Sequence, residues 1–232
     1  MTQHMISIVL PTRNEPEVDK LIAKIREILT QSNEAFEIVV IDKSDDDTAE
    51  RVRAAGVEVF KQKSKGLGGA LKEGLGIARG DIIITMDADF SHDPRYIPDF
   101  IKKMLEGFDL VIGSRKIPGG DVIGWNRRRK LVSGGANFVA RYIAGIKVSD
   151  LTSGYRAYRK TMINNLDLES IRSSSYAFQL EVTARAVKRG FKVGVVPIVF
   201  ADRRAGKSKL SRRDMVDFLY TSLKTRFSGG FA

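Results

Sequence analysis

The sequence contains no cysteine, so disulfide bonds and thiolate metal sites are excluded. Its two histidines, His4 and His92, leave little room for a zinc site built from histidine. No apolar run approaches the roughly 20 residues that a membrane-spanning helix needs. The apolar stretch Met5–Leu10 is too short for a signal peptide and lacks a basic flank. We therefore expect a chain with neither a signal peptide nor a transmembrane helix, which can still sit on a membrane surface.

The 232 residues include 39 Lys and Arg against 28 Asp and Glu, which gives a formal net charge of +11. Such an excess suggests an anionic partner, which can be a nucleic acid, a phospholipid or a phosphorylated small molecule; solubility alone is the alternative. The basic stretches lack interleaved aromatic residues that could stack on bases, and no nucleic-acid-binding motif is present. The charge therefore favours phosphate-bearing lipids or small molecules over nucleic acid.

Apolar runs and amphipathic segments alternate in the first half of the chain. This alternation predicts an α/β fold with a mixed, mainly parallel sheet and helices on both faces. We expect strands at Ile6–Leu10, Phe36–Ile41, Val57–Phe60 and Asp81–Met86, and helices from Pro16, at Thr48–Ala54 and at Gly68–Arg79. In the less regular second half we expect strands at Leu110–Gly113 and Phe191–Val199, and helices at Asn126–Ile143, Tyr176–Lys188 and Ser211–Phe227. Because Pro197 interrupts its strand, that strand suits a sheet edge.

Polar clusters follow three of the expected strands at the points where those strands end. In open parallel sheets, ligands bind outside the carboxyl ends of the strands. These clusters should therefore meet at one edge of the sheet and form a binding site. They are Pro11–Glu15, Asp42–Asp47 and Asp87–Asp89.

The acidic pair Asp87 and Asp89 directly follows an apolar strand. Two carboxylates one residue apart can hold a hard divalent cation that is completed by substrate phosphate oxygens. A solvated turn is the alternative for so short a motif, but the position at a strand end favours binding. Asp42 also ends a strand. Because Asp45–Asp47 are better placed to cap the next helix, we expect Asp42 to be free to bind a base or a ribose.

Two basic runs, Arg127–Lys130 and Arg203–Lys209, stand in the second half of the chain. A solvated surface is the alternative, but the nearby Gly119, Gly120 and Gly206 suggest loops that fold over an anion. The terminal helix also carries basic residues beside an apolar face, so it can lie on a membrane or pack on the domain. The face comprises Met215, Phe218, Leu219 and Leu223, with Arg212, Arg213, Lys224 and Arg226 nearby.

A set of motifs along most of the chain is typical of one enzyme family. The motifs are Leu10–Glu15, Met86–Pro94, Gly113–Arg115, Gly124–Trp125, Ser133–Phe138, Asp150–Arg156, Phe178–Glu181, and Phe200–Arg203 with Gly206–Leu210. With them, the sequence resembles the dolichyl-phosphate mannose synthases, which are inverting GT-A-type glycosyltransferases of family 2. The resemblance extends from about residue 5 to about residue 223.

The resemblance implies a role for each matching residue. Catalysis is expected at Asp89, Arg115 and Arg203. The nucleotide sugar is expected to contact Pro11, Arg13, Glu15, Ile41, Asp42, Asp87, Ala88, Asp89, Arg115, Arg203 and Lys209. The acceptor phosphate is expected at Arg129, Ser133 and Arg203, and a metal at Asp87 and Asp89 with Ser91 nearby.

The implied reaction transfers mannose from GDP-mannose to dolichyl or another polyprenyl phosphate, with inversion and with Mg²⁺ or Mn²⁺. A phosphate acceptor is already anionic at pH 7 and needs no general base. Lys43 stands where many family members have a second aspartate. A polyprenyl-phosphate hexosyltransferase that uses another nucleotide sugar, such as UDP-glucose, is therefore the alternative. A protein that only senses nucleotide sugars is disfavoured, because sensing does not need an acceptor cluster such as the one that includes Arg203.

We expect residues 1–232 to form one catalytic domain. Residues from about 5 to 125 would bind the nucleotide sugar, about 126 to 210 the acceptor, and about 211 to 227 the membrane surface. This organisation implies a peripheral protein on the cytoplasmic face of a membrane, with membrane-anchoring subunits as candidate partners.

Overall fold

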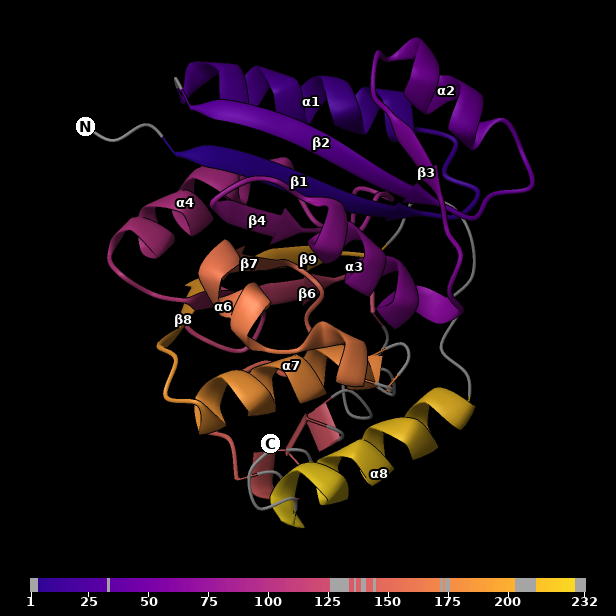
Figure 1. Ribbon diagram of the computed structural model, residues 1–232. Helices are drawn as coiled ribbons and strands as arrows, with labels where there is room; N and C mark the ends of the chain where they lie inside the picture. Colours follow the sequence, from indigo (N-terminus) through magenta and orange to yellow (C-terminus); the bar gives the residue numbers. More distant parts are fainter. Residues whose placement is uncertain are drawn as a thin grey trace.

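A mixed seven-stranded sheet lies at the centre of the protein (Figure 1). The computed structural model describes residues 4–32, 34–125, 134–135, 137–138, 141–143, 145–171, 173, 176–202 and 212–227. The sheet has the order β3-β2-β1-β4-β7-β5-β8. Its strands are β1 (Met5–Thr12), β2 (Ala35–Asp42), β3 (Val59–Lys61), β4 (Ile82–Thr85), β5 (Leu110–Ser114), β7 (Arg156–Arg159) and β8 (Val193–Pro197).

Strand β7 alone runs antiparallel to its neighbours β4 and β5, and every other pair in this sheet is parallel. The predicted mixed, mainly parallel sheet is therefore confirmed. Strand β8 forms an edge and ends at Pro197, as the sequence predicted, because proline has no N–H to donate to a further ladder bond.

Helices cover both faces of the sheet, as predicted. Successive strand side chains point to opposite faces, so Ile6, Ile8 and Leu10 of β1 enter one core while Val9 enters the other. The first core is covered by α1 (Val18–Gln31), α2 (Thr48–Ala54) and α4 (Ile97–Leu105). The second is covered by α3 (Gly66–Ile77), α6 (Lys160–Asn165) and α7 (Tyr176–Lys188). Short 3₁₀ turns lie at Pro94–Tyr96 and Leu168–Ser170.

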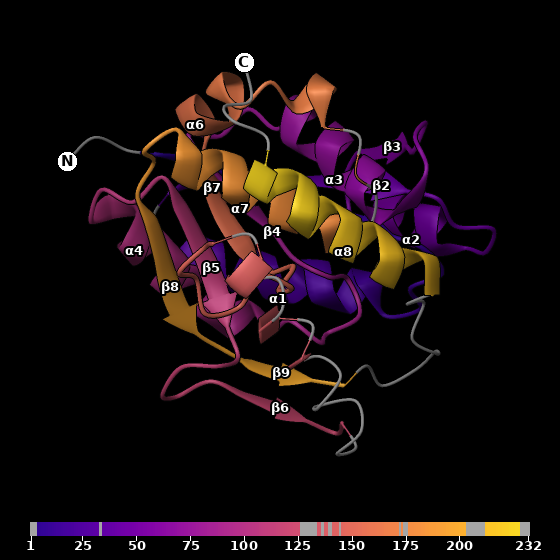
Figure 2. The same cartoon turned by 90° about the horizontal axis from the view of Figure 1, so that it is seen from below.

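The expected strand Phe191–Val199 divides into β8 and a separate strand, β9 (Val199–Ala201). Strand β9 pairs with β6 (Asp121–Ile123) in a small parallel sheet, seen below the main body in Figure 2. The chain leaves the large sheet at Ile198, whose N–H donates to the Ser114 carbonyl and whose carbonyl accepts from the Asp121 N–H. This bend carries β9 away from the sheet edge and toward the polar loops.

Helix α8 (Arg212–Phe227) packs on the outer side of α7, as Figure 2 shows. The sequence placed Phe218, Leu219 and Leu223 on one apolar face of this helix. In the structure they differ in exposure, because Phe218 is buried whereas Leu219 and Leu223 are exposed. The side chain of Met215 lies outside the described part. Among the described residues, no helix is long and apolar enough to span a bilayer.

Candidate active site

The carboxyl ends of β1 and β2 lie side by side, with Thr12 opposite Asp42 in the strand register. The buried Asp42 carboxylate accepts hydrogen bonds from Thr12 Oγ1 (2.6 Å), Ser44 Oγ (2.6 Å) and the Ser44 N–H (3.1 Å). As expected, Asp42 does not cap the helix that follows, since Asp47 is at its N-cap and Asp46 accepts from the Thr48 N–H. The Asp42 carboxylate links the ends of β1 and β2 through Thr12, and its contact with a nucleotide stays a prediction.

The loops after β1 and β2 are also hydrogen-bonded to each other. Asn14, at a left-handed φ of 58°, donates from its N–H to Ser44 Oγ (2.8 Å) and from Nδ2 to Asp45 Oδ1 (2.6 Å). The Glu15 N–H donates to Thr48 Oγ1 at 2.9 Å. These bonds fix the loops that carry the predicted nucleotide-contacting residues.

The predicted nucleotide-contacting residues differ in how far their side chains are exposed. Arg13 is exposed, and Pro11 and Glu15 are half-buried, so their side chains can reach a ligand. Ile41 and Ala88 have their side chains in the hydrophobic cores and can offer only backbone groups to a ligand.

The acidic pair begins two residues after the end of β4, at Asp87. Asp89 Oδ1 accepts from the Ser91 N–H (3.0 Å) and from Ser91 Oγ (2.5 Å), while Phe90 between them has a left-handed φ of 61°. Ser91 is buried, so it orients the Asp89 carboxylate from behind. The Asp87 side chain is one-third exposed. This geometry fixes the Asp89 carboxylate two residues from the partly exposed Asp87.

Two carboxylates fit a divalent cation only if other oxygens complete its coordination. No group of three or more His, Asp or Glu side chains that could hold a metal occurs in the described part of the chain. Mg²⁺ and Mn²⁺ bind through few carboxylates when phosphate oxygens are also available. Asp87 and Asp89 therefore suit a cation that arrives with a diphosphate.

His92 lies behind this loop and is buried. Its Nδ1 accepts from the Asp87 N–H at 2.9 Å. Burial lowers the pKa of His92, although the nearby Asp87 charge opposes the change. The ring is therefore neutral at pH 7, and its 3.7 Å approach to the Asp87 carboxylate is not an ion pair.

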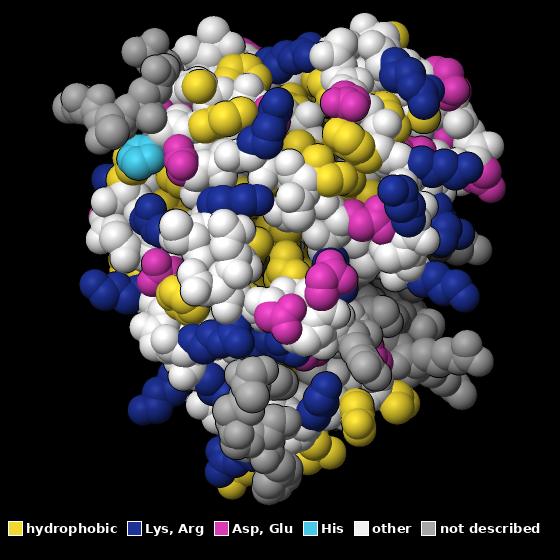
Figure 3. Space-filling model, viewed as in Figure 1, with side chains coloured by type: hydrophobic (Ala, Val, Ile, Leu, Met, Phe, Trp, Pro, Cys, Tyr) yellow, Lys and Arg dark blue, Asp and Glu magenta, His cyan; other side chains and the backbone are white. Residues whose placement is uncertain are grey.

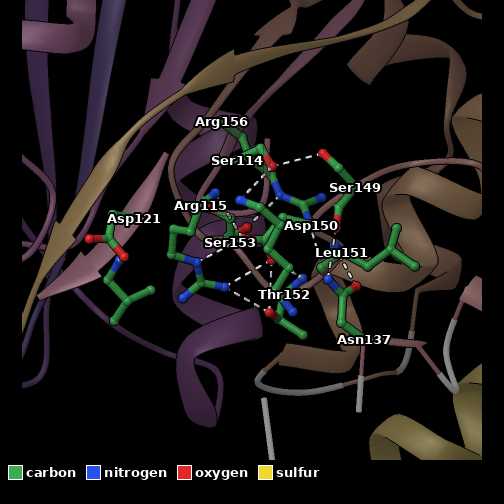
Figure 4. A network of polar contacts seen from close by, with 12 residues as sticks. Ser114, Arg115, Asp121, Asn137, Ser149, Asp150, Leu151, Thr152, Ser153 and Arg156 are labelled. Atoms are coloured by element: carbon green, nitrogen blue, oxygen red, sulfur yellow. Dashed lines mark hydrogen bonds and ion pairs between the residues drawn. The ribbon is translucent and has the colours of Figure 1, made fainter. Parts of the chain in front are cut away.

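Arg115, which follows β5, is paired with Asp150 (Figure 4). Its Nε and Nη2 donate to the two Asp150 oxygens at 2.7 and 2.9 Å, and Nη2 also donates to Thr152 Oγ1 at 2.8 Å. Arg115 is 6% exposed and Asp150 is fully buried. Burial alone would raise the pKa of Asp150, but the Arg115 charge and hydrogen bonds lower it to about 2.

Sequence reasoning gave Asp150 no role, although it lies within the motif Asp150–Arg156 that carried part of the resemblance. Arg115 was expected to meet phosphates, and the structure shows that Asp150 already compensates its charge. Aromatic rings pack on the same guanidinium, with the ring centres of Trp125 and Phe200 5.6 and 5.5 Å from its central carbon. Such contacts favour a fixed cation.

Arg156 on β7 holds the loop that carries Asp150. It is fully buried and donates to the carbonyls of Leu151 (2.9 Å), Ser153 (2.7 Å) and Gln179 (2.8 Å). Burial lowers the pKa of its guanidinium. Arg156 thus fastens the loop to α7, while Asp150 of the same loop pairs with Arg115.

Four predicted site residues lie outside the described residues: Arg129, Ser133, Arg203 and Lys209. The neighbouring strand β9 is described, and it runs beside the acidic loop. The Ala201 N–H donates to the Ser91 carbonyl at 3.3 Å, and Phe200 forms an isolated antiparallel bridge with His92. Arg203 follows this strand by two residues in the sequence.

A sheet of this order, with acidic residues after β4 and a second cluster after β5, defines a GT-A-type glycosyltransferase fold. Structures of glucosyl-3-phosphoglycerate synthase from Mycobacterium tuberculosis share it. One, in complex with Mn²⁺, UDP and glucosyl-3-phosphoglycerate, has a TM-score of 0.71 at 21% identity and covers 96% of this chain and 80% of that chain. Another, with Mg²⁺ and UDP, has a TM-score of 0.72 at 21% identity, with 96% and 79% covered. At this identity the likeness shows the fold alone.

Residues 7–167 match the model of Glycosyl transferase family 2, and the chain belongs to this family. It is 38% identical over 213 residues to the undecaprenyl-phosphate mannosyltransferase of Micrococcus luteus, covering 88% of this chain and 86% of that protein. It is 36% identical over 224 residues to the polyprenol monophosphomannose synthase of Mycolicibacterium smegmatis, covering 92% and 83%. The predicted family is confirmed, and the protein is a glycosyltransferase.

Proposed function

We propose that this protein transfers mannose from GDP-mannose to dolichyl or another polyprenyl phosphate, with inversion at the anomeric carbon. The observation that carries the proposal is the identity of 36–38%, over most of the chain, to two enzymes that are named for mannose and for polyprenyl lipids. The site supports it with a carboxylate pair suited to a divalent cation that accompanies a diphosphate, and with a separate cluster around Arg115.

In the proposed reaction, an oxygen of the acceptor phosphate forms a bond to the anomeric carbon of mannose. The bond from that carbon to the diphosphate breaks, and its electron pair leaves with GDP. No proton has to be removed, because the acceptor is already anionic. This agrees with a site in which the buried His92 uses Nδ1 to accept from backbone and is not placed as a base.

Asp87 and Asp89, with Ser91 behind them, would hold Mg²⁺ or Mn²⁺ against the diphosphate. The cation would supply positive charge that stabilises the departing GDP. Glu15, Pro11 and other residues of the loops after β1 and β2 would contact the nucleoside.

The acceptor phosphate is a second anion, and basic side chains on the acceptor side of the site must compensate its charge. Asp150 compensates Arg115, so we assign most of the acceptor's charge compensation to Arg129 and Arg203, with Ser133 and Lys209 as further contacts. Arginine suits this task because its planar fork binds phosphate oxygens in pairs. Arg115 would then contribute a fixed donor at the boundary between the two phosphates.

We further propose that α8 rests on the membrane that holds the acceptor. The helix buries polar Thr221, Ser222 and Thr225 and exposes apolar residues. The hydroxyls of Ser222 and Thr225 bond within the helix, to the Phe218 and Ser222 carbonyls at 2.7 and 2.8 Å, so their burial leaves no donor unpaired. The exposed side chains are Val216, Leu219, Tyr220 and Leu223.

Hydrophobic side chains gather over α8 at the lower edge of Figure 3, with basic ones beside them. Elsewhere on the surface, Phe138 and Tyr142 are two exposed and stacked rings with their centres 6.5 Å apart. An apolar strip with basic neighbours can enter the headgroup region of an anionic bilayer. We place this surface on the cytoplasmic face, with membrane-anchoring subunits as candidate partners.

Vesicle flotation tests the surface. The double variant Leu219→Ser with Leu223→Ser should lose binding to anionic vesicles, and the matched control Leu105→Ser, an exposed apolar residue on α4, should keep it. Salt should weaken binding of the wild type. Unchanged flotation of the double variant would contradict the assignment of α8.

A transfer assay with radiolabelled GDP-mannose and polyprenyl phosphate tests the function. We expect a mannosyl lipid in the presence of Mg²⁺ or Mn²⁺ and none with the unphosphorylated polyprenol. Transfer from UDP-glucose in place of GDP-mannose would instead establish the hexosyltransferase alternative. Absence of transfer from both donors would reject the proposal.

A further inference from the structure

The buried ring of His92 contacts the acidic loop and strand β9 at the same time. Its Nδ1 accepts from the Asp87 N–H at 2.9 Å, so the start of the loop is bonded to a side chain five residues later. An atom that accepts from an N–H carries no proton of its own. The bond therefore requires the neutral ring with its proton on Nε2.

Packing holds this ring in place. The ring centre lies 5.0 Å from that of Tyr155 and 5.4 Å from that of Phe200, which it meets edge-on. A Cβ placed on Gly154 would be 3.5 Å from both the His92 ring and Asp87 Oδ1, so the ring and the carboxylate lie against the same backbone. The ring has little room to turn, and its Nδ1 is aimed at one backbone donor.

We propose that His92 is a positioning residue that fixes the backbone of Asp87 and so sets the carboxylate pair for a cation and its diphosphate. The inference rests on the proposed function for the identity of the diphosphate. Groups that orient metal-binding residues from behind change metal affinity by about 10- to 100-fold when removed. The competing role is that of an ordinary core histidine, which would matter through packing alone.

Two substitutions separate these roles. Asparagine can place Oδ1 where Nδ1 stands, so His92→Asn keeps the acceptor and loses the ring contacts with Tyr155 and Phe200. His92→Phe keeps ring contacts and loses the acceptor. A positioning role predicts that His92→Phe, which lacks the acceptor, binds metal and nucleotide more weakly. A packing role predicts that His92→Asn, which lacks the ring, is the variant that binds more weakly.

Calorimetry of GDP binding, with Mn²⁺ and with EDTA, measures the difference. With Mn²⁺ we expect His92→Phe to bind about 10-fold more weakly than wild type, and His92→Asn to stay within about 3-fold, well below the loss expected when such a contact is removed. In EDTA the wild type and both variants should bind GDP with the same affinity, because the residues proposed to contact the nucleoside are unchanged. Melting temperatures should show the reverse order, with His92→Asn the less stable variant. Wild-type binding by His92→Phe, or an equal loss in His92→Asn, would overturn the proposal.

Hydrogen exchange of the unliganded protein gives a second measurement that needs no nucleotide. The Asp87 amide should be protected in wild type and in His92→Asn but exchange faster in His92→Phe, with the rest of the sheet unchanged. Equal protection in His92→Phe would also overturn the proposal. Parallel calorimetry with UDP distinguishes failure of the proposed donor from failure of the His92 proposal. Binding of UDP without GDP rejects the proposed donor while the His92 comparison proceeds with UDP. If neither binds, the proposed function fails and hydrogen exchange decides the His92 contact.

Discussion

Replacing Asp150 with asparagine removes a charge from the most buried ion pair near the site. Arg115 reaches both carboxylate oxygens at 2.7 and 2.9 Å, and neither side chain is more than 6% exposed. The amide of asparagine can accept one of these bonds but cannot compensate the positive charge. The substitution therefore leaves a buried guanidinium without its carboxylate.

The expected loss of stability follows from two measures. The lowered pKa of Asp150, about 2 against an ordinary 3.8, corresponds to about 2 kcal/mol of stability at neutral pH. Removal of one partner of a buried ion pair typically costs about 3–5 kcal/mol. We expect Asp150→Asn to lower the free energy of unfolding by about 3 kcal/mol, which for a domain of this size lowers Tm by about 6–12 °C.

Urea denaturation at neutral pH measures this loss, and Asp47→Asn provides the control. Asp47 pairs with Arg51 at 2.7 Å, but both are largely exposed, so its replacement should leave the urea midpoint unchanged. The double variant Arg115→Met with Asp150→Leu should regain much of the stability, since no charge is left buried. It should not regain transfer activity, because Arg115 is then missing from the site.

The acid side of the stability curve offers a further measurement of the same pair. Because the folded-state pKa of Asp150 is depressed, its contribution is complete above about pH 4 and is lost as the pH falls toward about 2. Wild type should thus lose more stability over this range than Asp150→Asn. The reasoning is refuted if Asp150→Asn unfolds at the wild-type urea concentration, or if the two acid profiles are parallel.

Three other predictions concern single residues. Asp89→Asn should abolish metal-dependent transfer while the circular dichroism spectrum and Tm stay close to wild type, since an asparagine amide oxygen can still accept from the Ser91 N–H and hydroxyl. Arg203→Ala should lower kcat by about 10- to 150-fold in steady-state kinetics, the effect of losing one charge-assisted phosphate contact, with a smaller change in donor binding. An unaltered kcat would eliminate this role. Arg156→Lys should destabilise the protein in urea, because an ammonium cannot serve three carbonyls and the Thr183 hydroxyl at once; an unchanged midpoint would contradict that account.

The first half of the fold could be predicted because each strand is a short apolar run that stops at a polar cluster. The parallel pairing then brought the first two clusters together, as Thr12 opposite Asp42 shows, and the third cluster follows β4, which pairs in parallel with β1. Helix α4 was missed although its signal is present. Ile97, Phe100, Ile101 and Met104 repeat at helical spacing after Pro94, and all four are buried.

Strand β7 could not be recognised from its residues. Its sequence, Arg156-Ala157-Tyr158-Arg159, begins and ends with arginine and does not resemble a central strand. Arg156 can be buried only because carbonyls of a distant helix and of a neighbouring loop accept its N–H groups. Such partners exist only once the fold has formed, so no local sequence pattern predicts them.

The same limit explains why the two sides of the site looked separate in the sequence. One loop between Ser149 and Gly154 connects them in the structure. Near its start, Asp150 holds Arg115 of the second cluster. At its end, the Gly154 carbonyl accepts from Thr85 Oγ1 at 2.9 Å, and the Gly154 backbone lies against Asp87 and His92. A displacement of this loop would therefore move Arg115 and the start of the acidic loop together. In the proposed transfer with inversion, the attacking and departing oxygens would lie on opposite sides of one carbon, and a shared support would keep their separation constant.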